Sequence, residues 1–349
     1  MFFYILKRLL LMIPTLFGIM LLTFIVTQFV PGGPVEQLVH QLQGESQTGE
    51  VATGFGQTYR GRAGLDDEIL NKIKLRYGFD KPIHQRFWMM IKNYLVLDFG
   101  DSYFQHKSVI SLIKEKLPVS ISLGIWTFLI TYLISIPLGI SKALYHGSRF
   151  DVISSTVILV GYAIPGFLLG IALLVLFGGG SFYDVFPLRG LISDNFDSLS
   201  FWSKITDYLW HIFLPVLAMS VGSLAVMTML TKNSFLEEIS KQYVITARAK
   251  GLSETTISYR HILRNAMIPL ITGFPAAFIG AFFTGSLLIE QIFSLDGLGL
   301  LSYESILRRD YPVVLGSLFI FSLMGLVAKL MSDISYVLID PRIAFDEAR

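Results

Sequence analysis

The sequence predicts an all-α polytopic membrane protein, and three observations support this fold class. Of its 349 residues, 53% are hydrophobic and only 15% are charged, whereas soluble domains carry roughly 25% charged residues. The mean hydropathy is +0.60. Six apolar runs reach the length of about 20 residues that a helix needs to cross a bilayer. We therefore expect six transmembrane helices.

The first apolar run could be mistaken for a signal peptide because it follows Lys7 and Arg8. Its 22 residues exceed the roughly 7–15 of a signal-peptide core, and no small-x-small cleavage motif follows it. We expect it to remain in the protein as the first span. In chain order, the expected spans are residues 9–30, 119–143, 152–177, 210–230, 267–293 and 313–338.

Basic residues predict which side of the membrane each connection faces, because short cytoplasmic connections carry an excess of Lys and Arg. With six spans, both termini lie on the same side. The termini and the second and fourth connections, with Lys142 at the adjoining end of the second span, carry twelve Lys and Arg residues, whereas the third and fifth connections carry four. Both termini are therefore expected in the cytoplasm.

The connections divide the chain into three expected parts. Residues 1–30 hold the cytoplasmic N-terminus and the first span, and residues 31–118 form a small helical insertion on the extracytoplasmic side. Residues 119–349 form a five-span core with a long cytoplasmic loop at 232–266.

The insertion is expected to contain one loop and two helices. Residues 44–64 are rich in glycine and poor in large aliphatic side chains, which predicts a flexible loop. Residues 66–79 and 83–100 have the apolar spacing of amphipathic helices. The second is rich in aromatic residues and suits the membrane interface.

Composition excludes several kinds of site. The chain has no cysteine, and its six histidines are scattered without the spacing of metal ligands, so we expect neither a disulfide nor a metal site. A net charge of +2 without a basic patch gives no reason to expect nucleic-acid binding. The phosphate-binding motif Gly-x-x-x-x-Gly-Lys-Ser/Thr is absent, so ATP would have to bind a partner. No catalytic residue is expected.

The cytoplasmic loop is much longer than a turn requires, and its sequence LEEISKQYVITARAKG predicts a docking helix. Acidic residues come first, basic residues come last, and Gly251 stands where a C-cap falls. The small residues Thr246, Ala247 and Ala249 would let another protein approach the backbone, with Arg248 and Lys250 beside them. A solvated amphipathic hairpin without a partner explains these residues equally well.

One stripe of the fifth expected span is a candidate for the lining of a pathway. It recurs every four residues, which places its members on one helix face: Phe278, Phe282, Ser286 and Glu290. An ionisable residue near a membrane suggests a function, although Glu290 could equally be an interfacial carboxylate. A transporter driven by an ion gradient would need acidic residues near mid-span, and the sequence has none there.

Several motifs resemble those of permease subunits of peptide-type ABC importers. TARAKGL followed by RNAMIP resembles the cytoplasmic signature of these permeases, and FVPGGP, DFGDSY, LPVSISLG, RDYPVV and IDPRI occur in the expected order over the whole chain. The resemblance implies the type I ABC importer permease fold in a bacterial inner membrane. It also implies oligopeptide import driven by ATP and Mg on a partner, with dipeptides, nickel or another solute as alternative cargo.

The same resemblance implies a complex with a second permease, an ATPase with two nucleotide sites and a periplasmic peptide-binding protein. The general signature of such permeases is Glu-Ala-Ala, three residues, then Gly. The aligned residues here begin at Ile245, and only Ala247 and Gly251 match, so the acidic anchor is missing. The expected ATPase-coupling residues are Tyr243, Thr246, Ala247, Arg248, Ala249, Lys250, Gly251 and Leu252.

Overall fold

The computed structural model describes residues 2–29, 80–178, 182–283 and 286–339, and these residues are mostly helical with no named strand among them. Four described helices are long and apolar enough to cross a membrane: α1 (Phe2–Phe29), α5 (Val109–Leu144), α8 (Phe201–Ile239) and α15 (Tyr311–Ile339). They overlap the first, second, fourth and sixth expected spans, and α5 and α8 extend well beyond the predicted bounds. The all-α fold class is confirmed.

The other two expected spans are bent. Helices α6 (Arg149–Ala163) and α7 (Gly166–Phe177) meet at an angle of 92°, so residues 152–177 are not one straight helix. Pro165 lies at the bend and accounts for it, because proline disfavours a helical conformation in the residue before it. The count is therefore four spans, or six if each bent pair crosses the membrane once.

The second bend lies in the segment that leads to the fifth expected span. Residues Glu254–Ala266 and Ile268–Ala281 meet at 50°. The first part comprises α10 (Glu254–Thr256), the π-helical segment η2 (Ile257–Ile262) and α11 (Leu263–Ala266), and the second is α12 (Ile268–Phe283). The expected span 267–293 is also shorter than predicted, because α12 ends at Phe283 and α13 (Leu287–Ile292) is a separate helix.

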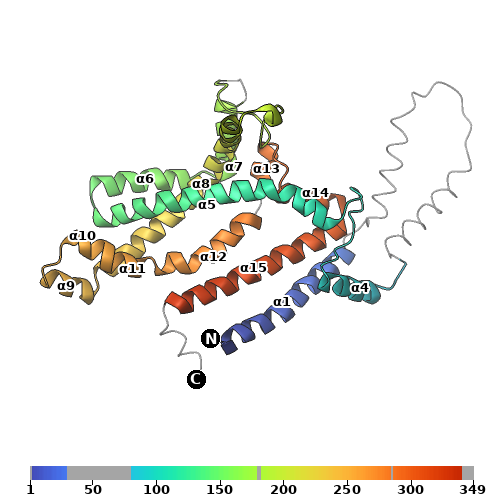
Figure 1. Cartoon of the computed structure of the whole chain (residues 1–349), viewed down its shortest axis with the longest axis horizontal. Coiled ribbons are helices and arrows are strands. Elements are labelled where there is room, and N and C mark those ends of the chain that lie inside the picture. The colour runs from blue at the N-terminus through green and yellow to red at the C-terminus, as the bar shows by residue number, and fades with distance from the viewer. Residues whose placement is uncertain (1, 30–79, 179–181, 284–285, 340–349) are drawn as a thin grey trace, which may run out of the picture. The chain divides into compact units, whose positions relative to one another are not determined.

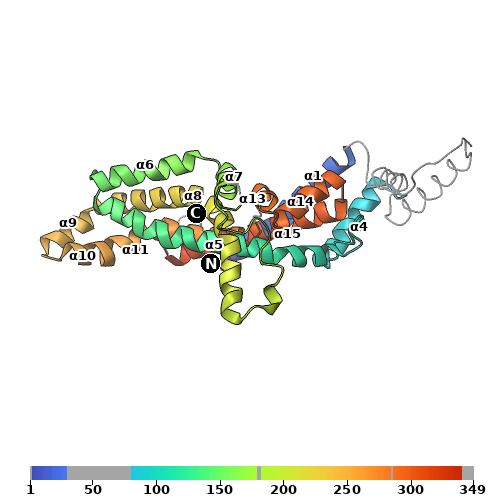
Figure 2. The ribbon, with the colours of Figure 1, turned by 90° about the horizontal axis from the view of Figure 1, so that it is seen from above.

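The chain divides into two compact units. Unit 1 comprises residues 1–8, 116–300 and 324–349, and unit 2 comprises residues 9–115 and 301–323. In unit 1, α6 and α7 pack against α8, and α6 and α8 lie side by side in both views (Figures 1 and 2). Helices α9 (Gln242–Ala249), α10 and α11 gather at one end of this unit (Figure 1).

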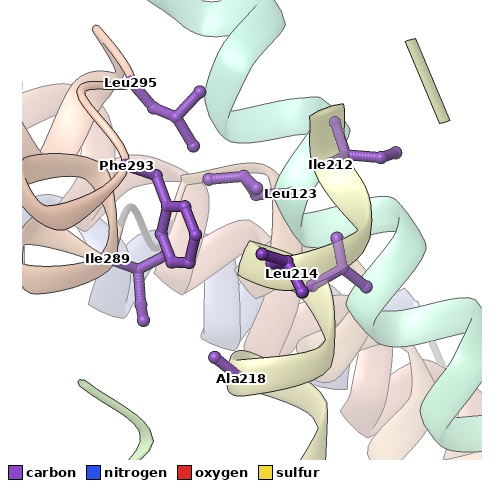
Figure 3. Packing of buried hydrophobic residues seen from close by; sticks show 8 residues of the cluster. Leu123, Ile212, Leu214, Ala218, Ile289, Phe293 and Leu295 are labelled. Atoms are coloured by element: carbon purple, nitrogen blue, oxygen red, sulfur yellow. The ribbon is translucent and has the colours of Figure 1, made fainter. Parts of the chain in front are cut away.

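Two apolar clusters form the core of unit 1. The first joins α5, α8, α13 and the segment that follows α13; Figure 3 shows Leu123, Ile212, Leu214, Ala218, Ile289, Phe293 and Leu295 converging. The second joins the end of α5 and the end of α8 to α9, η2 and α11. Helices α5 and α12 approach so closely that a Cβ at Gly124 would lie 1.6 Å from the carbonyl oxygen of Ala281.

Unit 2 is assembled largely from aromatic contacts. Helix α4 (Ile83–Leu95) packs on α1 through Phe87, whose ring centroid lies 5.3 Å from that of Phe24. The buried carboxylate of Asp310, just before α15, accepts hydrogen bonds from the Ser102 hydroxyl and from the Tyr103 N–H at 3.1 Å. The motifs DFGDSY and RDYPVV thus meet in space.

The helix expected over 83–100 is confirmed as α4, which ends at Leu95. The expected loop 44–64 and helix 66–79 lie outside the described residues. Most of the insertion 31–118 does so too, and the three-part division of the chain stays a prediction.

Candidate functional site

The expected docking segment is a short helix, α9, whose C-terminal end is closed by the local sequence. Gly251 has φ +77 and ends the helix, a conformation that suits glycine. Its N–H donates to Arg248 O at 2.9 Å, and Leu252 N–H donates to Ala247 O at 3.4 Å, the two bonds of a Schellman motif. Ser253 then caps the next helix through Thr256 N–H. The predicted glycine C-cap is confirmed.

The two faces of α9 have different surroundings. Val244 and Ala247 are 0% and 7% exposed and belong to the apolar cluster with Ile257, Ile262 and Phe235. Ala247 therefore packs against its own chain, contrary to the expectation that its small size serves a partner's approach. The other expected contact residues are exposed, apart from half-buried Tyr243: Thr246, Arg248, Ala249, Lys250, Gly251 and Leu252.

Hydrogen bonds tie α9 to the helices on either side of it. Tyr243 Oη donates to Glu238 Oε2 of α8 at 2.6 Å, and Lys241 forms an ion pair with the same carboxylate. The side chain of Asn265 in α11 bonds to Glu238 and Tyr243. Burial, reinforced by the bond to Glu238, raises the pKa of Tyr243 to about 12. The docking helix is therefore fastened to both α8 and α11.

The basic residues of the segment differ in their partners. Arg248 Nε lies 2.7 Å from Glu254 Oε1 in an exposed ion pair, and this carboxylate raises the pKa of Arg248. Lys250 forms no ion pair within the described part of the chain. An acidic partner surface would thus meet Lys250 first and would compete with Glu254 for Arg248.

A cavity of about 1110 Å³ lies within unit 1, walled by α5, α6, α7, α8, α12 and α13. Among the described residues its lining includes no Asp, Glu, Lys, Arg or His side chain. The lining residues that carry hydroxyl groups are Thr127, Thr131, Tyr132, Tyr162, Ser223 and Ser286, and the hydroxyl oxygens of Thr127 and Thr131 are closed to solvent. The remainder is apolar or glycine, so the cavity suits a neutral or mixed solute more than a densely charged one.

The expected pathway stripe does not form one continuous face, because α12 ends before α13 begins and the fourfold spacing is interrupted. Ser286 lines the cavity. Phe278 is outside the lining set, but its ring lies 5.5 Å from that of Phe128, which lines the cavity. The side chain of Phe282 lies outside the described residues.

Glu290 is placed away from the cavity lining, and its side chain is 0% exposed. Its carboxylate accepts hydrogen bonds from Leu300 N–H at 2.7 Å and from the Ser120 hydroxyl at 3.4 Å. A Cβ at Gly297 would lie 2.5 Å from the carboxyl carbon, so glycine permits this approach. The geometry is that of an acidic group at the start of α14 (Leu298–Arg308).

Sequence reasoning missed a buried ionic cluster. Asp151 of α6 accepts bonds from Lys232 of α8 at 2.7 and 2.8 Å, and Lys142 of α5 lies 3.1 Å from the same carboxylate. All three are buried, although the two lysines were counted only as indicators of the cytoplasmic side. Two basic residues and one acidic residue at neighbouring span ends are the signal that could have revealed the cluster.

No group of three or more His, Asp or Glu side chains within the described ranges could hold a metal ion.

Residues 135–345 match the family of the binding-protein-dependent transport system inner membrane component. The chain belongs to this family. As an inner membrane component of such a system, it is a permease with several membrane-crossing helices.

Relatives of the permease cover nearly all of it. It is 59% identical to the peptidoglycan transport system permease protein YejB of Agrobacterium fabrum, over 98% of each chain. It is 57% identical to the inner membrane ABC transporter permease protein YejB of Escherichia coli O157:H7, over 98% of this chain and 99% of that protein. It is 30% identical to the oligopeptide transport system permease protein AppB of Bacillus subtilis, over 98% of this chain and 99% of that protein.

These matches confirm the resemblance to peptide-type ABC importer permeases. The chain is the translocation component of an ABC importer and is not an enzyme. It acts with other subunits of that importer.

Proposed function

We propose that this permease forms half of a passage that brings oligopeptides from the periplasm into the cytoplasm. The other half is a second permease similar to YejE. A periplasmic binding protein similar to YejA delivers the peptide, and an ATPase similar to YejF, with two nucleotide sites, supplies the energy. Both termini face the cytoplasm. The permease itself holds no cofactor, and ATP and Mg²⁺ bind to the ATPase.

One structural observation carries the proposal: the docking segment and the cavity wall belong to one stretch of chain. Val244 and Ala247 of α9 pack in one cluster with Ile257 and Ile262 of η2. Through α11, η2 leads directly to α12, which contributes Pro269, Leu270, Gly273 and Ala277 to the cavity lining. A displacement of α9 is therefore transmitted to a wall of the cavity.

The expected cycle follows from this connection. Closure of the ATPase on ATP displaces α9, the bend at Met267 and the π-helical segment absorb part of the rotation, and α12 moves relative to α5 and α8. The cavity then opens toward the periplasm and receives the peptide. Hydrolysis returns it to the inward-facing state. Alternating access of this kind needs a two-state element, and the bent α10–α12 segment is the best candidate.

The cargo assignment rests on the relatives. The names of two of these relatives give peptidoglycan and oligopeptides, and an uncharged cavity with hydroxyl-bearing residues suits amide-rich solutes. Dipeptides, nickel or another solute are the alternatives. Nickel is disfavoured by the lack of His, Asp and Glu in the described lining.

The test uses the full four-part complex in proteoliposomes and the variant Ala249→Trp. Ala249 is exposed, so a bulky side chain there blocks a partner without disturbing the permease. We expect peptide uptake to collapse while the complex still hydrolyses ATP. Asp194→Trp, at an exposed position in the third connection, is the matched control and should leave uptake intact. Normal uptake by an assembled Ala249→Trp complex would overturn the docking role of α9.

The cargo is tested in the same vesicles. Unlabelled oligopeptides should compete with a labelled oligopeptide for uptake, and Ni²⁺ should not. Competition by Ni²⁺ alone, with no ATP-driven peptide uptake, would replace the peptide assignment and leave the importer assignment standing.

A further inference from the structure

Two glycines inside long helices have no structural reason to be glycine. Gly222 lies in α8 and Gly273 in α12, and a glycine in a helix interior costs about 1 kcal/mol relative to alanine. Neither has a positive φ, so the backbone does not require them. A Cβ at either position would meet no described heavy atom within 4 Å, so packing does not require them either.

Other glycines of the same unit show what a packing requirement looks like. A Cβ at Gly124 would collide with Ala281, and a Cβ at Gly139 would lie 2.5 Å from Thr231 Cβ. At Gly222 and Gly273 the missing side chain adjoins empty space, and both residues line the cavity. What these two glycines preserve is the open width of the cavity.

Two threonines of the lining have enclosed hydroxyl groups. Thr131 of α5 is 5% exposed, and its Oγ1 has no hydrogen-bond partner within the described ranges. Thr127, one turn earlier on the same helix, is likewise without a partner for its Oγ1. Both oxygens are closed to solvent, so neither hydroxyl faces the open space beside Gly222 and Gly273.

The lining also limits what kind of selection is possible. It has no ionisable side chain other than tyrosine among the described residues, so the cavity cannot select cargo by charge through a complementary side chain. Size and apolar character are the properties that a wall of glycine, large apolar and hydroxyl-bearing side chains can select.

We propose that Gly222 and Gly273 set the width of the passage and so determine the bulk of the peptide side chains that this permease admits. The inference rests on the proposed function, in which the cavity is the passage. It adds that two glycines, one on α8 and one on α12, limit the size of the solute that can pass.

The experiment narrows the passage by single substitutions. Gly222→Leu and Gly273→Leu are made in the four-part complex, and ATP-driven uptake is measured for trialanine and triphenylalanine. For each peptide, uptake is expressed relative to the wild type, which cancels the preference of the unaltered binding protein. We expect uptake of triphenylalanine to fall at least about tenfold more than uptake of trialanine, because one methylene too many in a tight site discriminates by about 10- to 200-fold.

Two controls separate width from folding. Gly325 of α15 also has open space around its Cβ and does not line the cavity, so Gly325→Leu should change neither uptake. Gly222→Ala and Gly273→Ala should unfold at the same temperature as the wild type or higher, because alanine is the better helix former. Lower unfolding temperatures for the alanine variants would mean that these glycines serve packing, and the proposal would be wrong.

A double variant, Gly222→Trp with Gly273→Trp, separates the two levels of the argument. If it stops uptake of both peptides while ATP hydrolysis persists, the cavity is the passage. If the Leu variants then reduce the relative uptake of both peptides equally, the size filter is overturned, and the assignment of the cavity as the passage stands. If the assembled double variant transports both peptides normally, the cavity is not the passage, and the proposed function of the cavity fails with it.

Discussion

The substitution Asp151→Asn should strongly destabilise the permease by leaving two buried lysines without a counter-ion. Asn keeps the shape of the side chain and retains an oxygen that can accept the Gly147 N–H, a bond of 3.1 Å in the wild type. It removes the charge and places an amide nitrogen, which cannot accept a hydrogen bond, where Oδ1 faces Lys142 and Lys232. The neighbouring N-cap of α6, in which Ser148 accepts from the backbone N–H of residue 151 at 3.2 Å, is unaffected.

The magnitude follows from what each lysine retains. Lys142 still donates to Ser154 Oγ at 2.8 Å, to Ser155 Oγ at 2.7 Å and to the residue 151 carbonyl at 2.9 Å. Lys232 has only the two carboxylate bonds among its described contacts, so it loses its charged partner entirely. Removing one member of a buried ion pair costs about 3–5 kcal/mol, and we expect a loss of free energy of unfolding in that range.

The assay is denaturant unfolding of the purified permease in lipid–detergent mixtures, followed by tryptophan fluorescence. The double variant Asp151→Asn with Lys232→Met removes the stranded ammonium and should recover more than half of the lost stability. A loss below about 1 kcal/mol for the single variant, the range of exposed pairs, would refute the reasoning, because it would mean that water reaches the cluster. Equal losses in the single and double variants would also refute it.

Two further predictions concern unit 1. Gly124→Ala should prevent normal assembly, because its Cβ would fall 1.6 Å from a backbone oxygen of α12; Gly222→Ala is the control, and comparable yields of both variants on size-exclusion chromatography would contradict the close approach. Tyr243→Phe should lower stability by about 1 kcal/mol without abolishing ATP hydrolysis, through loss of the bond to Glu238. Because the pKa of Tyr243 is raised from 10.0 to about 12, this contribution should be complete below pH 10 and disappear as pH rises from 10 toward 12. A stability difference between wild type and Tyr243→Phe that varies with pH near pH 7 would contradict it.

The sequence predicted the existence of the straight spans and the end of α9 well, because these depend on local chemistry. Apolar length located α1, α5, α8 and α15, although α5 begins earlier, at Val109, and α8 extends at both ends, from Phe201 to Ile239. Gly251 marked the end of α9 through its own backbone preference. The break at Pro165 also had a local signal, the proline itself. A prediction from the length of the apolar run alone does not take that signal into account. Hydropathy measures how apolar a run of residues is, and it does not show whether one helix continues through the run.

Three features could not be predicted from the sequence, because tertiary contacts decide them. The inward position of Ala247 depends on η2 and α11 folding against α9, and a small residue looks the same whether its own chain or a partner covers it. The burial of Glu290 depends on backbone N–H groups ten residues away. The partnership of Lys142, Lys232 and Asp151 joins three helices, and no spacing rule along one helix can reveal it.

The docking helix is held in shape by the permease itself. Its cap, its buried Val244 and its bonds to α8 and α11 involve no residue of another protein. An interface that is already ordered loses less conformational entropy on association than a segment that must fold as it binds. The ATPase is thus expected to meet a rigid surface, so that the work of nucleotide closure goes into moving the helix and little is dissipated in ordering it.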